Sequence, residues 1–293
     1  MAKFINPFTD IGFKRIFGQE ISKPVLIAFL NALLGEERTI VDVNYLDKEQ
    51  PSESVYDRSL IYDVYCKLDS GEHIIVEMQN RSQPFFKNRS VYYVSRSISR
   101  QGEPGPEWRY DVKAVYMIAL LNFKRDDISS EFRTDVALMD MKHKKLFSDK
   151  IRLIYLQLPY FTKELDDCES LFERLIYVLK HMDVLQRMPW LAQDAVFKKL
   201  ASIADVASMS PKERSDYDEN LRRYRDTVSV MEGQYLEGRA EGRVAGRAEG
   251  REEGRAEGRV EIARNLKKMG MSVSDIARAT GLAEEEVKAL QMS

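Results

Sequence analysis

The stretch that decides the fold is "IIVEMQ", Ile74–Gln79, an apolar run that carries a Glu and a Gln two positions apart. Its β-branched residues predict a strand. Side chains alternate along a strand, so Glu77 and Gln79 point to one face while Val76 and Met78 point to the other. A carboxylate buried without a partner is costly, and Glu77 therefore needs a cation, a metal ion or water beside it.

The stretch before this run supplies a second carboxylate. "SLIYDVYC" (59–66) predicts another strand, and the turn formers at 69–71 predict a hairpin that joins the two. Seven residues separate Asp63 from Ser70 and seven more separate Ser70 from Glu77, which places the two acids opposite each other, about 5 Å apart. Like charges this close are destabilising unless a cation lies between them. Oxygen ligands suit Mg²⁺, so we expect a magnesium site in which Mn²⁺ substitutes.

The neighbouring patterns predict an α/β core. Residues 6–35 and 86–102 have helical spacing, and 39–46, 112–123 and 150–161 have the character of strands, the second of them apolar enough for the middle of a sheet. From residue 164 to 237 the pattern is helical. We therefore expect a core over residues 1–125 and a strand with a helical subdomain over 126–236.

Residues 237–262 repeat with a period of four. Gly stands at six positions, each followed by Arg: 238, 242, 246, 250, 254 and 258. Six interior Gly cost an isolated helix roughly 6 kcal/mol relative to Ala. Most Glu and Arg are two apart, so they point to different sides of the helix and few can form the i,i+3 or i,i+4 ion pairs that stabilise one. Either the segment is a helix that self-associates, making the protein a homo-oligomer, or it is a mobile charged linker. A helical pair with this period winds right-handedly.

The last segment, 263–293, has the pattern of two helices around a turn. Ser274 is the expected cap of the first helix, and Gly281 makes the turn. This resembles a helix-turn-helix, but the second helix begins with the acidic run 284–286, which repels phosphates. A small packing unit and a DNA-reading module both stay open.

Composition limits the partners and the compartment. The 293 residues carry a net charge of −2, so affinity for DNA must come from a local patch, and residues 81–125 hold nine Lys or Arg against three acids. Two distant Cys (66 and 168) and three scattered His (73, 143 and 181) argue against a zinc site and suit a reducing cytoplasm. No signal peptide and no long apolar run are present, so we expect a cytoplasmic protein with no membrane span.

An Asp on one strand, Glu-x-Gln on the next, a basic helix and then an apolar strand resemble the PD-(D/E)XK nuclease superfamily. With "NPFTDIGFKRIFG" (6–18) before the pair and "FFKNRSVYYVSR" (85–96) after it, the chain resembles the bacterial recombination-promoting nuclease and transposase family. The resemblance covers nearly the whole chain. It implies a restriction-endonuclease-like mixed sheet flanked by helices, followed by a helical subdomain and a repeat-bearing helical tail.

The resemblance also implies an activity: Mg²⁺-dependent endonucleolytic hydrolysis of DNA, in recombination, mobile-element or defence biology. Asp63 and Glu77 match the metal ligands of the motif, and the Met78 main-chain carbonyl is the expected third ligand. Gln79 stands where the superfamily carries its catalytic Lys, and it donates only a neutral hydrogen bond. The family resembled here usually carries Gln at this position, so we expect Gln79 to align the attacking water.

The missing positive charge has several candidate sources. Lys14, Lys87 or Arg89 could supply it, and Asp10 on the first helix could reach the metal ion. For Asp10 and Lys14, a helix cap and a surface charge are equally open interpretations. Phosphates on either side of the cut are expected to contact Arg89, Arg96 and Arg100.

Two alternatives compete with the nuclease. The chain could be a catalytically weak or inactive nuclease fold that binds DNA while its tail sets the oligomeric state, or a scaffold whose tail carries the function. At the site itself, Asp63 and Glu77 could be edge-strand charges neutralised by Arg58 or Lys67.

Overall fold

The structure is a computed structural model that describes residues 2–35, 39–50 and 60–290. The chain divides into two compact units, Met1–Tyr224 and Arg225–Ser293. Arg58 and the other residues between Gln50 and Leu60 lie outside the described residues, so the interpretation that involves Arg58 stays a prediction.

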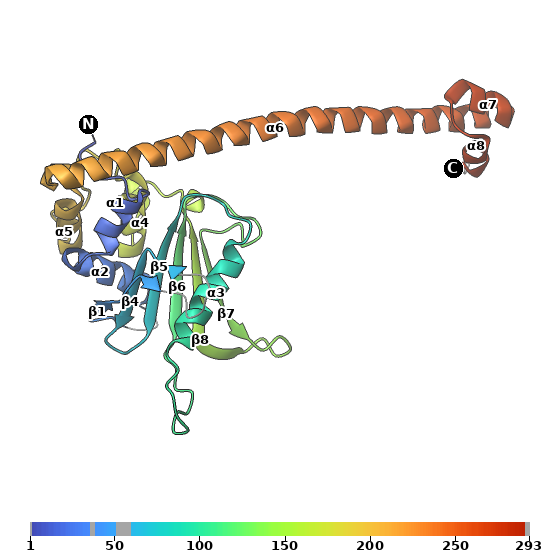
Figure 1. The fold of residues 1–293 in the computed structure, drawn as a ribbon. Helices are drawn as coiled ribbons and strands as arrows, with labels where there is room; N and C mark the ends of the chain where they lie inside the picture. The colour runs from blue at the N-terminus through green and yellow to red at the C-terminus, as the bar shows by residue number, and fades with distance from the viewer. Residues whose placement is uncertain (1, 36–38, 51–59, 291–293) are drawn as a thin grey trace. The chain divides into compact units, whose positions relative to one another are not determined.

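The first unit contains a six-stranded mixed sheet in the order β1-β4-β5-β6-β8-β7 (Figure 1). Its strands are β1 (Val43–Tyr45), β4 (Val64–Leu68), β5 (His73–Gln79), β6 (Val115–Leu121), β7 (Arg133–Met139) and β8 (Leu146–Gln157). The strands β5, β6 and β8 are parallel, whereas β1, β4 and β7 pair antiparallel with their neighbours. A separate short pair joins β2 (Glu49–Gln50) to β3 (Leu60–Ile61). The predicted mixed α/β sheet is confirmed.

Helices cover both faces of this sheet (Figure 1). One face packs against α1 (Asp10–Phe17), α2 (Lys23–Leu34), α4 (Leu171–His181) and α5 (Ala195–Ala204), and the other packs against α3 (Phe86–Ser99). Short 3₁₀ turns lie at Glu20–Ser22, Leu158–Tyr160, Leu165–Asp167 and Val206–Ser208. All seven residues of β6 are buried because the strand is central and covered on both sides.

The core extends past the boundary expected at residue 125. The strand predicted over 150–161 is β8, which pairs with β6, and β7 adds an edge strand that the sequence pattern did not reveal. The helices α4 and α5 bury their apolar faces in the same core as α1 and α2. The helical stretch after residue 164 therefore completes one face of the sheet.

The segment that leads into α1 has a tightly fixed geometry. The Thr9 hydroxyl accepts a hydrogen bond from Gly12 N and donates one to Asn6 O, while Asn6 Oδ1 accepts from Phe8 N. A Cβ at position 12 would lie 2.1 Å from Asn6 O, so only Gly fits there. The sequence "NPFTDIG" thus builds one specific entry into the helix that carries Asp10 and Lys14.

The long helix α6 (Pro211–Lys268) includes the repeat 237–262, and among the described residues nothing lies within 4 Å of a Cβ placed on its glycines. Beyond it, α7 (Val273–Thr280) and α8 (Glu284–Ala289) pack through Ala263, Ile276 and Val287.

The cap of α7 differs from the prediction. Ser272, not Ser274, caps the helix, because its hydroxyl accepts from Asp275 N at 3.2 Å. Gly281 ends α7 at φ 72°, as expected. None of the described helices is long and apolar enough to cross a membrane.

Candidate active site

The hairpin of β4 and β5 brings two carboxylates together. Val64 pairs with Val76 and Lys67 with His73, which is the register predicted from the sequence. One step beyond this ladder, Asp63 N donates to Glu77 Oε1 at 3.3 Å and Met78 N donates to Asp63 Oδ2 at 2.9 Å. Each carboxylate thus accepts a hydrogen bond from a backbone N–H of the segment that carries the other acid.

Contrary to the prediction, Asp63 does not lie in the middle of a strand. It lies in a bend before β4 begins at Val64, and this bend directs its carboxylate toward the backbone of β5. The two strands lie inside the sheet, so the pair does not lie on an edge strand, while neutralisation by Arg58 stays a prediction. Lys67 is exposed at the turn end of the hairpin, opposite His73, and forms no ion pair with either acid within the described part of the chain.

The environment of the pair favours the protonated form. Glu77 is only 3% exposed, and burial together with the nearby charge of Asp63 raises its pKa to about 8. Burial also raises the pKa of Asp63, although the hydrogen bond from Met78 N opposes this. Without a cation the pair holds a proton at neutral pH, and a cation that binds both carboxylates would displace it.

Two of the expected cations act on this pair. The charge of Arg89 lowers the pKa of both acids, and the charge of Lys14 lowers that of Asp63. Lys14 is itself ion-paired with Asp10 at 2.5 Å, and the charge of Asp10 contributes to the raised pKa of Asp63. The structure therefore brings Asp10, Lys14 and Arg89 into electrostatic range of the pair.

Gln79 contacts the pair directly. Its Nε2 donates to Glu77 Oε2 at 3.1 Å. The Met78 N–H points toward Asp63, and in a strand the N–H and C=O of one residue point to the same neighbour. The Met78 carbonyl therefore also points to the Asp63 side, as a third oxygen ligand requires.

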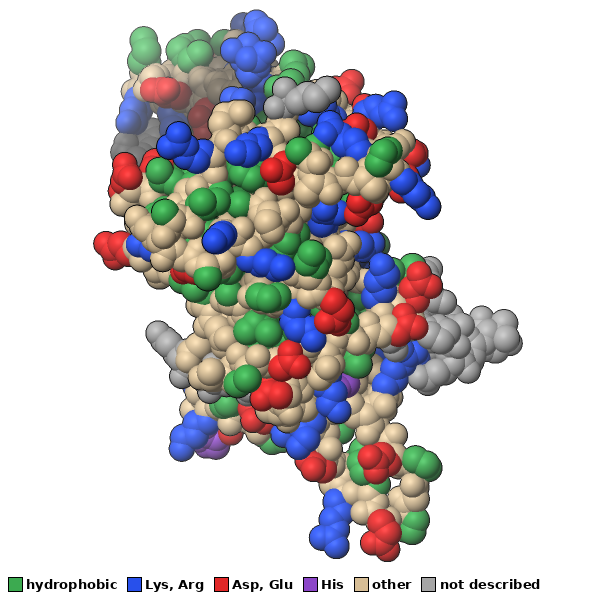
Figure 2. Space-filling model, turned by 90° about the vertical axis from the view of Figure 1, so that its left-hand side faces the viewer, with side chains coloured by type: hydrophobic (Ala, Val, Ile, Leu, Met, Phe, Trp, Pro, Cys, Tyr) green, Lys and Arg blue, Asp and Glu red, His purple; other side chains and the backbone are tan. Residues whose placement is uncertain are grey.

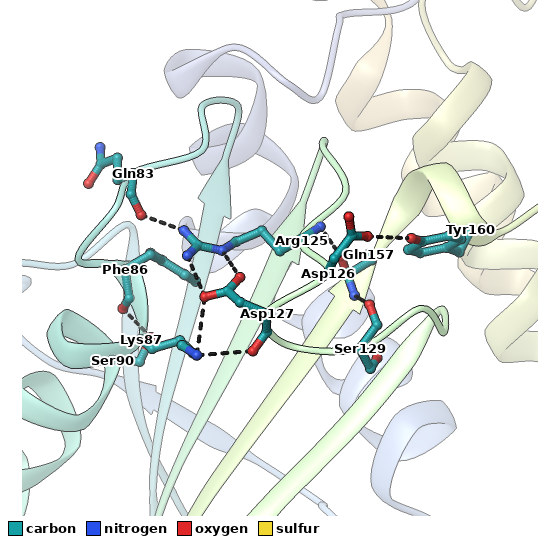
Figure 3. Close-up of polar contacts among 10 residues, drawn as sticks. All are labelled: Gln83, Phe86, Lys87, Ser90, Arg125, Asp126, Asp127, Ser129, Gln157 and Tyr160. Carbon is teal, nitrogen blue, oxygen red and sulfur yellow. Dashed lines mark hydrogen bonds and ion pairs between the residues drawn. The ribbon is translucent and has the colours of Figure 1, made fainter. Parts of the chain in front are cut away.

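Lys87 has a different place from the one expected. Its ammonium binds Asp127, with 3.1 Å to Oδ2 and 3.0 Å to the carbonyl oxygen, as Figure 3 shows. Arg125, only 9% exposed, donates two hydrogen bonds of 2.7 Å to the same carboxylate and one to Gln83 O. The hydrogen bonds from Arg125 and Lys87 hold the pKa of Asp127 far below its usual range. Lys87 thus belongs to a network that ties the loop after β5 to the loop after β6.

The expected DNA-binding arginines are spaced by seven and four residues: Arg89 and Arg96 lie on one side of α3, and Arg100 caps its C-terminal end. All three are half-buried. Arg89 Nη1 donates to Gln83 Oε1 at 2.6 Å, and its guanidinium lies over the rings of Phe86 and Tyr93. These contacts hold the Arg89 charge beside the carboxylates.

Sequence reasoning missed Asn80, the residue directly after Gln79. Its Nδ2 donates to Phe8 O at 2.6 Å, which ties the end of β5 to the entry of α1. The only signal in the sequence was an amide side chain at the end of a strand that already carried two polar groups.

The donor set is compatible with a divalent cation. Within the described ranges no group of three or more His, Cys, Asp or Glu side chains could hold a metal ion, so a site here relies on two carboxylates and a carbonyl. Asp63 Oδ1 accepts no hydrogen bond from the described residues, and Mg²⁺ ordinarily keeps several waters. Two carboxylates of this kind, one of them buried and protonated without a cation, fit such an ion.

A mixed sheet flanked by helices, with an Asp just before one strand and a Glu on the neighbouring strand, defines an α/β domain consistent with the restriction-endonuclease-like fold. Residues 7–234 match the family described as PD-(D/E)XK nuclease family transposase, and the chain belongs to that family. The family suggests a nuclease or transposase-related role on DNA, and its nucleases generally use divalent metals. No curated protein and no solved structure matches the chain significantly.

Proposed function

We propose that the protein is an Mg²⁺-dependent DNA endonuclease, with Mn²⁺ as a substitute ion, that hydrolyses phosphodiester bonds. The observation that carries this proposal is the Asp63–Glu77 pair, in which Glu77 is buried and Asp63 half-buried, and in which like charges lie side by side within range of Lys14 and Arg89. A purely structural role gives no reason to place two carboxylates this close.

The ligands in this proposal are Asp63, Glu77 and the Met78 carbonyl. An ion held by these residues would supply Lewis-acid chemistry, lowering the pKa of a water and neutralising charge on the scissile phosphate. Gln79 aligns that water through its amide. Arg89 and Lys14 supply the positive charge that a Lys at position 79 would otherwise bring.

The phosphates next to the cut are bound by α3 in this proposal. Arg89 and Arg96 share one side of the helix, Arg100 caps its end, and residues 81–125 carry nine Lys or Arg against three acids. In a chain of net charge −2 this local excess supports DNA contact at α3.

A second candidate is DNA binding with little or no turnover. The observation that favours it is Gln79, which cannot carry charge and whose amide is already bonded to Glu77. In this case the nuclease fold would bind DNA and the tail would set the oligomeric state.

The biological process, the cellular compartment and the role of the tail are further proposals. We assign the protein to recombination, mobile-element or defence biology and to the bacterial cytoplasm, where the buried free thiols of Cys66 and Cys168 fit the reducing conditions. We also propose that 237–262 pairs with a second copy and that 263–293 is a separate small unit. Sedimentation of the full chain beside a chain ending at Tyr235 tests the pairing, since equal oligomeric states would exclude it.

Plasmid nicking with Mg²⁺ tests the enzyme proposal. Wild type should nick supercoiled DNA, Asp63→Ala should not, and Asp166→Ala, which changes an exposed acid far along the chain, should behave as wild type. Nicking that persists in Asp63→Ala contradicts the assigned site. DNA binding without nicking in all three supports the second candidate, and absence of both supports a scaffold.

A further inference from the structure

The hairpin between β7 and β8 has a tip that the candidate site does not use. Its residues 141–147, "MKHKKLF", include three Lys and no acid. The apolar side chains beside the lysines are unusually accessible, with exposed fractions of 78% at Met141, 60% at Leu146 and 79% at Phe147. Exposed hydrophobic side chains next to like charges are typical of a surface that binds a partner.

The tip is a fixed turn. Asp140 organises it: its Oδ1 accepts from Lys142 N at 2.8 Å and His143 N at 3.1 Å, and its own N donates to Lys145 O at 2.9 Å. Lys144 adopts φ 55°, which closes the turn. Lys142, Lys144 and Lys145 are exposed and form no ion pair within the described ranges. Three unneutralised ammonium groups therefore project from one ordered turn.

The hairpin extends from the end of the sheet opposite the carboxylates (Figure 1). Glu77 is in register with Ala119 and Ala119 with Tyr155, and β8 runs nine residues from Tyr155 back to Leu146, the residue next to Lys145. At strand spacing this is on the order of 30 Å, close to one helical turn of duplex DNA. The same side of a duplex presents its phosphates again after one turn.

The helix α3 covers part of this distance. It begins at the Lys87–Asp127 contact, near the carboxyl ends of β5 and β6, and its last turn reaches the start of β5, where Ser97 contacts His73 at 3.2 Å. Its arginines therefore run from the carboxylate end of the sheet toward the hairpin end. By contrast, the side of the molecule that carries α2 and α5 intersperses charges of both signs (Figure 2).

We propose that residues 141–147 form a second DNA-binding element, which contacts the backbone of a duplex about one helical turn away from the carboxylate pair. This inference rests on the proposed function, because it takes DNA as the substrate of the same domain. The lysines bind phosphates, and Met141 and Phe147 pack against the sugars. The hairpin adds affinity for long duplexes and leaves the chemical step unchanged.

The test compares two triple variants of the full chain with equal charge change. Lys142→Ala/Lys144→Ala/Lys145→Ala removes the hairpin charges, and Lys198→Ala/Lys199→Ala/Lys212→Ala removes three lysines on α5 and α6. Binding to a 30-base-pair duplex is measured in EDTA between 50 and 200 mM salt. Each phosphate contact contributes about 0.9 to the slope of log K against log salt, so the hairpin variant should lose about 2 to 3 in slope and bind at least tenfold more weakly. The control should change little, and replacing the three hairpin lysines by Arg should restore the slope.

Nicking kinetics separate this inference from the proposed function. In an active enzyme the hairpin variant should raise KM and keep kcat. If wild type nicks but the hairpin variant keeps its affinity, slope and KM, the hairpin inference is wrong and the enzyme proposal stands. If wild type binds DNA through the hairpin but never nicks it, the hairpin inference stands and the enzyme proposal is wrong. Loss of binding to anionic phospholipid vesicles, with DNA binding unchanged, would overturn the inference in favour of a membrane surface.

Discussion

The replacement Glu77→Gln should stabilise the metal-free protein at neutral and alkaline pH. Burial and the charge of Asp63 raise the pKa of Glu77 from its ordinary 4.5 to about 8, so the folded state binds more protons than the unfolded state between these values. A group of this kind loses its stabilising effect as pH rises. Integrated from pH 5 to pH 7.5, the shift corresponds to a loss of about 3 kcal/mol in the wild type, which a Gln side chain avoids.

The assay is urea unfolding in EDTA at half-unit steps of pH, and the quantity is the difference in unfolding free energy between variant and wild type. The free-energy difference should increase as pH rises, with Glu77→Gln the more stable protein. For Glu103→Gln, a change at an exposed acid, the difference from wild type should not depend on pH. Millimolar Mg²⁺ or Mn²⁺ should stabilise the wild type and not the variant. A difference between Glu77→Gln and wild type that does not depend on pH would refute the reasoning.

Three further predictions concern the helices beside the pair. Gly12→Ala should destabilise the protein by about 1–3 kcal/mol in urea unfolding, because its Cβ would lie 2.1 Å from Asn6 O; an unchanged midpoint contradicts the assigned turn. Asn80→Ala removes the bond to Phe8 O and should cost about 1 kcal/mol in the same assay, with a disproportionate loss of nicking; equal nicking means that α1 needs no such anchor. Arg89→Gln should slow nicking roughly 100-fold and move its rising pH limb upward, whereas a purely DNA-binding Arg89 would change KM alone.

The register of the hairpin formed by β4 and β5 could be predicted from the sequence because a short turn leaves little conformational freedom. With the turn formers at 69–71 fixed, counting along two strands places Asp63 opposite Glu77. The bend at Asp63 was not predictable, since "LIYDVYC" has the composition of an unbroken strand. The edge strand β7 was missed because a half-exposed strand need not alternate cleanly, and its sequence "RTDVALM" does not.

The cations were harder to predict than the acids. Lys87 and Arg89 are two residues apart on a helix, so they point in different directions, and the sequence alone gave no reason to prefer one. Asp127, forty residues further along the chain, determines which cation acts on the carboxylates. It binds Lys87, so that Arg89 is the residue whose charge acts on the pair. Such a choice depends on tertiary contacts between two loops.

The absence of a Lys from position 79 makes this site depend on both faces of the sheet. A Lys there would bring its charge on β5 itself, whereas Lys14 and Arg89 come from α1 and α3, which pack on opposite sides. Each helix has its own anchor near the end of β5: Asn80 holds the entry of α1, and Gln83 contacts both Arg89 and Arg125. The charge at the site therefore depends on two packing arrangements that a Lys at position 79 would not need. It follows that changes at these anchors, which touch neither carboxylate, should reduce nicking more than they reduce stability.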